Sequence, residues 1–413
     1  MTLGWGPLEL SVMRDYWSFF SAGQWVYGRG AVRQLGHLLK QRNLRSVLLV
    51  TDSNLARLGY VDQVRGPLSD VGIQSMVFDG GEPEPSIRVA EAAFEFANSR
   101  RIDAVLGLGG GSNMDLAKIV AILLTHQGHP RDYFHFDRVP GPVLPLICVP
   151  TTAGTGSEVS HAAVLTDSET GLKMSTLSPY LRPDLALVDP ALTDACPSQV
   201  TADSGIDALT HAIEGFCALD FSRVAVPGEQ AVPYAGSNPM GDWLAERAIR
   251  LIGEHLQTAV EQPEDQEARD GMSLAATLAG LAFSNCAVAV VHALEYPIGV
   301  ALHCSHGAGN GLILPYVMEY NRDVSAAKYA QILHWLGGDA SGMDLPSAAQ
   351  AAIDRIVALR QSIGIPHRLR DIGATEDQLP GFARKAFGIK RLMELNPRVP
   401  TEEGLLEILR RAL

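Results

Sequence analysis

The sequence predicts an N-terminal α/β domain over residues 1–190 and an almost entirely helical C-terminal domain over residues 191–413. The first part alternates short apolar runs with segments of helical periodicity, which is typical of a parallel sheet with helices on both faces. Beyond about Pro197 the strand patterns fade and long helical patterns dominate. A chain of 413 residues is also too long for one ordinary core, so two domains are expected.

Four apolar runs indicate strands of the first domain: 46–52 (SVLLVTD), 73–79 (IQSMVFD), 103–109 (DAVLGLG) and 145–152 (PLICVPTT). The second run is followed by a turn, GGEPEPS, and by helical spacing over 86–98. A glycine turn after the third run opens another helix. Residues 162–188 contain two short strands around a polar turn and then a further strand, so we expect a small hairpin layer to close this domain.

Helical patterns in the second domain cover 201–217, 239–259, 265–284, 345–363 and 402–412. Residues 218–239, between the first two, form a long loop with Pro, Gly and Ser. Loops of this length in compact domains are usually functional or mobile. A tolerated surface insertion explains the loop equally well.

Composition excludes several classes of protein. Hydrophobic residues make up 46% and charged residues 19%, as in a compact globular protein. The net charge of −13 leaves no basic surplus for nucleic acid. We expect no membrane partner, because no apolar run could span a bilayer and the N-terminus lacks a signal-peptide pattern. Five scattered cysteines without a CxxC motif favour reduced thiols in a cytoplasmic protein.

Two small-residue loops follow neighbouring strands. The first, GLGGGS at 107–112, would let backbone N–H groups approach a phosphate at a helix N-terminus, although ordinary tight turns share this pattern and it is not GxGxxG. The second, PTTAGTGSEVS at 150–160, adds hydroxyl groups. Two such loops at the carboxyl ends of strands mark a ligand crevice. Asp52 ends an earlier strand and is placed to bind a ribose, with a helix cap as the alternative role.

Four side chains could bind a metal ion. Asp207 and His211 are four residues apart and share one face of a helix, although a buried, hydrogen-bonded His is the ordinary explanation for such a pair. His292 lies in an apolar segment, where an unpartnered imidazole is costly, and His306 follows 14 residues later. One carboxylate and three imidazoles suit a divalent first-row metal. The glycines after His306 would let a helix start close to these ligands.

Together these motifs resemble the iron-containing (group III) alcohol dehydrogenase family over nearly the whole chain. The matching stretches are GGGSxxDxAK at 109–118, PTTAGTGSE at 150–158, LVDP at 187–190, TADSGIDALTHAIE at 201–214, HALEYPIG…HCSHGAGNGLILP at 292–315 and NPR at 396–398. The resemblance implies the dehydroquinate synthase-like architecture: a dinucleotide-binding α/β domain, a helical domain, and an active site in the cleft between them.

The resemblance also implies roles for individual residues. The implied metal ligands are Asp207, His211, His292 and His306. The implied nucleotide contacts are Asp52, Gly109, Gly110, Gly111, Ser112, Asp115, Thr151, Thr152, Thr155, Ser157 and Lys173. The implied cofactors are NAD, which the Asp52 carboxylate would favour over NADP, and Fe²⁺, with Zn²⁺ as the alternative metal. A small alcohol or aldehyde is the expected partner, and a homodimer the expected assembly.

Two features depart from the family pattern. Tyr296, in HALEYPIG, stands where the family usually has a His beside the nicotinamide or in a proton path. We therefore name Tyr296 and His303 as catalytic candidates for proton transfer, because histidine titrates near neutral pH and His303 lies three residues before His306. The alternative is a surface His303 and a proton that leaves through ribose hydroxyls and water. The 218–239 loop is also longer than usual and could lie over the substrate mouth.

The function implied is metal-dependent hydride transfer between a nicotinamide cofactor and a primary or secondary alcohol, aldehyde or ketone. A hydroxyacid–oxoacid transhydrogenase is the first alternative, since such enzymes can carry Tyr at this position, but they usually have a longer segment between the last two histidines. A sugar-phosphate cyclase of the dehydroquinate synthase type would need a cluster of basic residues near the ligands, and the sequence indicates none. A non-catalytic binding protein is disfavoured because all four ligand positions are filled.

Overall fold

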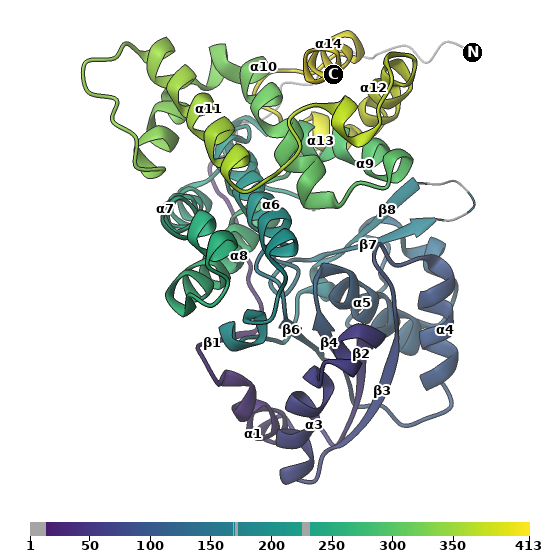
Figure 1. Ribbon diagram of the computed structural model, residues 1–413. Coiled ribbons are helices and arrows are strands. Elements are labelled where there is room, and N and C mark those ends of the chain that lie inside the picture. The colour runs from purple at the N-terminus through teal and green to yellow at the C-terminus, as the bar shows by residue number, and fades with distance from the viewer. Residues whose placement is uncertain (1–13, 168, 170–171, 225–231) are drawn as a thin grey trace, which may run out of the picture.

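The computed structural model describes residues 14–167, 169, 172–224 and 232–413, and these form two domains (Figure 1). The strands of the first domain lie in the purple-to-teal part of the ribbon, and the helices of the second run from teal through green to yellow. This arrangement confirms the predicted α/β and helical architecture. The division at residue 190 remains our proposal.

A six-stranded parallel sheet, in the order β1-β9-β6-β4-β2-β3, forms the first domain. Its strands are β1 (Gln24–Tyr27), β2 (Ser46–Asp52), β3 (Gln74–Gly81), β4 (Ala104–Gly109), β6 (Leu146–Pro150) and β9 (Leu185–Val188). The four strands expected from apolar runs are confirmed, and β1 is an addition. Because β4 pairs with β6, the two small-residue loops leave the sheet side by side, as predicted.

Helices cover both faces of this sheet because alternate strand residues point to opposite sides. In β2, Leu48 and Val50 join the core formed with α4 (Ile87–Ala97) and α5 (Gly111–His126). Val47 and Leu49 join the core of the other face, with α1 (Leu35–Gln41) and α3 (Tyr60–Asp70). The short helix α2 (Ser53–Arg57) follows β2 directly.

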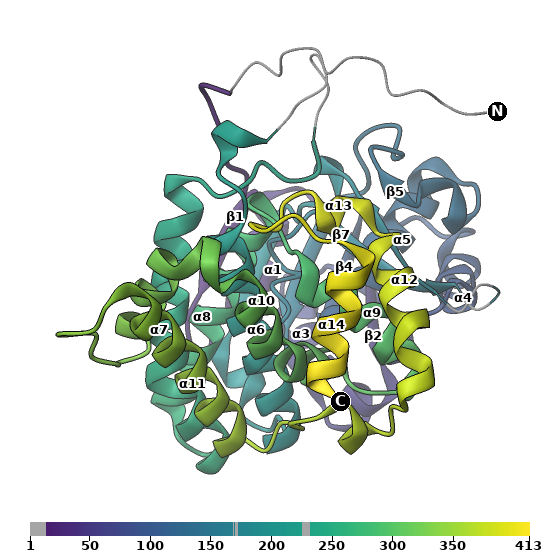
Figure 2. The same ribbon diagram turned by 90° about the horizontal axis from the view of Figure 1, so that it is seen from above.

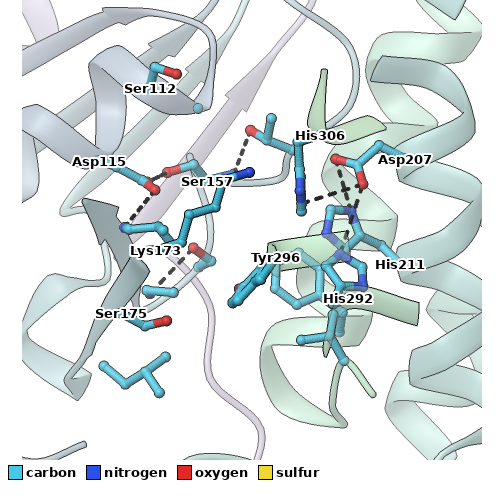
Figure 3. Close-up of a pocket in the computed structure, with 18 of the residues that line it drawn as sticks. Ser112, Asp115, Ser157, Lys173, Ser175, Asp207, His211, His292, Tyr296 and His306 are labelled. Atoms are coloured by element: carbon cyan, nitrogen blue, oxygen red, sulfur yellow. Dashed lines mark hydrogen bonds and ion pairs between the residues drawn. The ribbon is translucent and has the colours of Figure 1, made fainter. Parts of the chain in front are cut away.

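A second, three-stranded sheet holds the expected hairpin. In it β7 (Ala162–Asp167) pairs antiparallel with β8 (Leu172–Leu177), and the short β5 (His135–Phe136) pairs with β8. The further strand expected in 162–188 is β9, which joins the main sheet between β1 and β6 instead of the hairpin layer. The hairpin places Lys173 and Ser175 on the side of the helical domain (Figure 3).

The second domain consists of helices α6 to α14. Their bounds are α6 (Ser198–Cys217), α7 (Pro239–Glu261), α8 (Gln266–Asn285), α9 (Val290–Leu302), α10 (His306–Trp335), α11 (Leu345–Ser362), α12 (Leu379–Phe387), α13 (Lys390–Met393) and α14 (Glu402–Ala412). The five predicted helices are confirmed, whereas the periodicity did not indicate α9, α10, α12 and α13. Figure 2 shows α12 and α14 close to one another over α9 and α10.

Two predictions about the chain as a whole can be compared with this fold. Within the described residues, no single helix is long and apolar enough to cross a membrane; α8 and α9 pass that test only together, as a pair bent by 107°. Of the long 218–239 loop, residues 225–231 lie outside the described part. Before this gap, Phe221–Arg223 form a short 3-10 turn, and after it Tyr234 is buried.

Candidate active site

A cavity of about 210 Å³ lies between the two domains, and side chains from both line it (Figure 3). The structure brings eleven of the predicted site residues to this cavity: Gly111, Ser112, Asp115, Thr155, Ser157, Lys173, Asp207, His211, His292, Tyr296 and His306. The other six do not line it: Asp52, Gly109, Gly110, Thr151, Thr152 and His303.

Three of the four predicted metal ligands come together tightly. Asp207 lies on α6, His292 on α9 and His306 at the first residue of α10, and one ligand atom of each lies within 4.8 Å of the others. The Nε2 atoms of His292 and His306 are each 3.9 Å from Oδ1 of Asp207. This geometry gathers one carboxylate and two imidazoles from three helices around a single point.

His211 completes the ligand set from one side. It is not in the tight group of three, but its Nδ1 is 3.9 Å from Oδ2 of Asp207. Its ring stacks on His292 and Phe283, with centroids 4.7 and 4.2 Å apart. Burial lowers the pKa of His211 to about 3, so its imidazole is neutral and can donate a lone pair.

The ligand set fits a divalent metal on an independent criterion. Nδ1 of His211 and Nε2 of His292 are buried and have no hydrogen-bond partner among the described residues. Buried polar atoms without partners are costly and therefore rare. A metal ion among Asp207, His211, His292 and His306 would satisfy both nitrogens, and nitrogen and oxygen donors suit Fe²⁺ or Zn²⁺.

Two carboxylates that the sequence analysis missed orient the imidazoles. Glu214 on α6 contacts Nδ1 of His292 at 2.6 Å and accepts from the backbone N–H of Val291 at 2.7 Å. Glu295 on α9 makes the corresponding short contact with Nδ1 of His306. A carboxylate accepts at Nδ1–H and leaves Nε2 free to bind metal. The signal in the sequence was an acid inside an otherwise apolar helical stretch, in HAIEGF and HALEYP.

The glycines after His306 let α10 approach its neighbours. A Cβ on Gly307 would lie 1.9 Å from the carbonyl oxygen of Asp203 on α6, and one on Gly309 would lie 2.9 Å from Cγ of Glu295. Asn310, one turn after His306, donates to Oδ1 of Asp207 at 2.8 Å. The small residues are therefore required for close helix packing, and that packing brings the metal ligands together.

The glycine turn sits opposite the metal ligands, where β4 runs into α5. Gly109 has a φ of +143°, Gly110 caps α5 and Gly111 begins it. A Cβ on Gly111 would lie 2.9 Å from Cγ2 of Thr155, so the two small-residue loops are in contact. This cradle of backbone at a helix N-terminus has the features of a phosphate site, and that role remains a prediction.

Asp115 and Ser157 form part of a buried network beside this cradle. Asp115 accepts from Oγ of Ser157 at 2.6 Å and from the backbone N–H of Val164 at 2.9 Å. The fully buried Lys118 donates to both the hydroxyl and the carbonyl oxygen of Ser157, at 2.8 and 2.7 Å. These bonds fix the 150–160 loop against α5. Asp115 and Ser157 are therefore already held in place before any nucleotide binds.

Asp52 has the role that we considered as its alternative. Its carboxylate caps α2 by accepting from the backbone N–H groups of Asn54 and Leu55, at 2.9 and 3.1 Å. It also accepts from Nδ2 of Asn113 at 2.8 Å. A carboxylate oxygen can accept more than one hydrogen bond, so the ribose contact stays a prediction alongside the cap.

The two catalytic candidates have different positions. Tyr296 lines the cavity, with its ring centroid 6.1 Å from that of His306 and 6.0 Å from Nζ of Lys173. His303 is exposed, has a φ of +53° and ends α9. His303 does not line the cavity, and its exposed position matches the surface role that we considered as its alternative.

The cavity also contains groups that the sequence analysis did not name. Arg391 on α13 lines it and donates to Oγ of Ser175 on β8 at 2.7 Å. Tyr234, Phe283 and Val288 add apolar surface. The sequence indicated no cluster of basic residues near the ligands; in the structure, Lys173 and Arg391 line the same cavity as the metal ligands.

Comparison with known proteins places this site among related ones. A family model described as iron-containing alcohol dehydrogenase matches residues 22–190, and one described as the C-terminal part of the Fe-containing alcohol dehydrogenase family matches residues 228–413. The chain is 39% identical over 373 residues to long-chain-alcohol dehydrogenase 1 of Geobacillus thermodenitrificans (strain NG80-2), covering 90% of each chain.

Two further proteins match over almost their whole length. The chain is 33% identical to the NAD-dependent methanol dehydrogenase of Bacillus methanolicus, over 96% of this chain and 100% of that protein. Among solved structures, 1,3-propanediol oxidoreductase superposes with a TM-score of 0.90 at 33% identity, covering 97% of this chain and 100% of that one.

Proposed function

The chain belongs to the iron-containing alcohol dehydrogenase family, and from this premise we propose that it transfers a hydride between NAD and an alcohol whose oxygen binds at the Asp207, His211, His292 and His306 cluster. The supporting observation is the tight grouping of Asp207, His292 and His306 from three helices. These ligands line a cavity that Gly111 of the glycine turn also lines.

The chain's own residues supply orientation and environment. A bound divalent metal would lower the pKa of the alcohol and stabilise its alkoxide, while the nicotinamide accepts the hydride. Glu214 and Glu295 hold the imidazoles of His292 and His306 in place. Burial acts to raise the pKa of Glu295, but His306 and Lys173 lower it below its ordinary value, so Glu295 is a carboxylate and can accept from both.

Tyr296 stays our candidate for the proton path, since His303 does not reach the cavity. The alternative path runs through the ribose hydroxyls and water. If Tyr296→Phe kept the kcat of the native protein across pH, Tyr296 would carry no proton.

Metal dependence tests the proposed function directly. Chelation should abolish NADH formation from a panel of alcohols, and Fe²⁺ added without oxygen should restore it. His292→Ala and His306→Ala should each lose bound metal in elemental analysis, because each change removes one of the four donors and leaves a gap in the ligand set. Stoichiometric metal in either variant would contradict the ligand assignment.

The same assay separates the alternatives. A transhydrogenase would turn over only when an oxoacid is added to recycle the bound nicotinamide. A sugar-phosphate cyclase would release no net NADH. Free NADH formed from an alcohol alone supports the dehydrogenase and opposes both.

A homodimer in the cytoplasm completes the proposal. All five cysteines are free thiols, as a reducing compartment requires. β1 is an edge strand of the main sheet, and its Trp25 and Tyr27 are 36% and 37% exposed, an apolar edge that a second copy could cover. Light scattering of the purified protein would show a mass of two chains.

A further inference from the structure

Arg391 is a cation in the active-site cavity, and no carboxylate of the described residues is paired with it. Its one hydrogen bond among the described residues goes to the neutral hydroxyl of Ser175, and no carboxylate of that part of the chain forms an ion pair with it. Lys173, which lines the same cavity, is paired with Glu84 at 2.7 Å and with Glu295 at 3.3 Å. Among the described residues, the Lys173 ammonium is thus paired with carboxylates, whereas the Arg391 guanidinium is not.

A second cavity of about 540 Å³ adjoins the first and, unlike it, is lined by cations without carboxylates among the described residues. The two share Lys173, Ser175, Tyr296 and Arg391 in their walls. The second cavity adds Lys385 and Lys390, and none of its described lining residues is Asp or Glu. A local surplus of cations is notable on a chain whose net charge is −13, and such a surplus concentrates anions at a site.

The guanidinium of Arg391 suits an anion whose oxygens can accept two hydrogen bonds from it, and a carboxylate is one such group. Arg presents donors in a planar fork that matches a carboxylate, and it is less strongly hydrated than an ammonium group. Tyr234, Phe283 and Val288 provide apolar surface in the same cavity, where an alkyl chain can lie. The metal ligands and Arg391 both border this space, so one small molecule can reach both.

We propose that Arg391 and the cation-lined cavity beside it bind an anionic group at the far end of the substrate, and that the substrate class is an alcohol or aldehyde bearing a carboxylate. This inference rests on the proposed function, because the hydroxyl end must sit at the metal ligands. The reaction remains the transfer of a hydride to NAD⁺ with release of the hydroxyl proton, and the carboxylate is unchanged.

Two other roles for Arg391 make different predictions. If Arg391 only links α13 to β8 through Ser175, its loss should affect charged and neutral substrates equally. If it binds a phosphate of the cofactor, its loss should change the choice between NADH and NADPH. Only the proposed anion site predicts that loss of Arg391 lowers the preference for anionic over neutral substrates.

The test compares 4-hydroxybutanoate with butane-1,4-diol, and their three- and five-carbon homologues, in the full-length metal-loaded enzyme. We expect the native protein to have the higher kcat/KM with the hydroxy acid. Arg391→Gln should lower that preference roughly 10- to 100-fold, the usual effect of losing a charge-assisted hydrogen bond. Arg391→Lys should lower it less, because the charge remains. The matched control is Arg384→Gln, since Arg384 on α12 is 76% exposed and lines neither cavity. This variant should have the native kcat/KM with both substrates.

A binding measurement keeps the inference independent of turnover. Butanoate should bind the native protein in isothermal titration, with a Kd at least about tenfold higher for Arg391→Gln. The anion site would be overturned if the two proteins bound butanoate equally or if Arg391→Gln left the substrate preference unchanged. It would also be overturned if Arg391→Gln changed the ratio of kcat/KM with NADH to kcat/KM with NADPH. If neither alcohol reduces NAD⁺ but butanoate binding depends on Arg391, the proposed function fails and the anion site stands.

Discussion

Two of the three imidazoles in the metal cluster, those of His292 and His306, are held by a carboxylate on Nδ1. Glu214 is 2.6 Å from Nδ1 of His292 and is itself buried. We expect Glu214→Gln to weaken metal binding about 10- to 100-fold, the usual effect of removing such a hydrogen-bond partner. Competition with a chelator would measure the affinity. Glu254→Gln on α7 is the control, because Glu254 is 58% exposed, and similar affinities for both variants would contradict the orienting role.

Asp52 combines a helix cap with a predicted cofactor contact, and two substitutions separate them. Asp52→Asn keeps an oxygen that can cap α2 but removes the charge that would repel a 2′-phosphate. We expect it to narrow the preference for NADH over NADPH while the free energy of unfolding changes little. Asp52→Ala should narrow the preference as well and also cost ~1 kcal/mol from the lost cap. Higher kcat/KM with NADPH in the native protein would refute the assignment.

At the residue scale, the sequence predicts what spacing alone determines. Asp207 and His211 are four apart on α6, so one helical face holds both whatever the tertiary structure. Glu214 meets His292 across 78 residues, and Arg391 meets Ser175 across 216. Those contacts depend on how separate helices pack, and periodicity carries no information about that.

The element that sets the geometry of the metal site is α10, because its first turn packs directly on α6. Gly307→Ala would place a Cβ 1.9 Å from the carbonyl oxygen of Asp203, and the backbone cannot yield without moving His306. Overpacking of this kind costs ~1–3 kcal/mol. We expect a lower melting temperature and a reduced metal content.

A second alanine on the same chain serves as the control for that experiment. Gly381→Ala on α12 meets open space, so it should change neither quantity. If Gly307→Ala melted like the native protein and kept its metal, close approach of α10 to α6 would not be what assembles the site.

Elements with a regular apolar pattern could be predicted, and those without one could not. The apolar runs of β2, β4 and β6 are buried on both faces, as a parallel strand requires. Helix α9 contains Pro297, and α10 contains Pro315 and buried residues around much of its circumference. Neither helix therefore has the one-sided pattern that indicates an amphipathic helix. β1 has four residues, mostly exposed, which is too short a signal.

At the scale of the whole molecule, the cavity depends on how the two domains meet. Thr277 on α8 donates to the buried Glu158 at 2.7 Å, Lys173 on β8 pairs with Glu295 on α9, and Arg391 reaches Ser175. The change from strand to helix patterns predicted two domains. Their relative orientation could not be predicted, because it rests on single polar contacts between residues far apart in the chain.

Because the metal ligands lie on the helical domain and the glycine turn on the α/β domain, ligands bound in the cavity should stabilise the molecule as a whole. A ligand at about one hundred times its Kd adds ~2.7 kcal/mol to the free energy of unfolding. We expect Fe²⁺ and NADH, added without oxygen, each to raise the melting temperature of one common calorimetric transition. His306→Ala should lose the increment from metal. Two transitions, of which metal raises only one, would mean that the domains unfold independently and that the contacts across the cavity contribute little to stability.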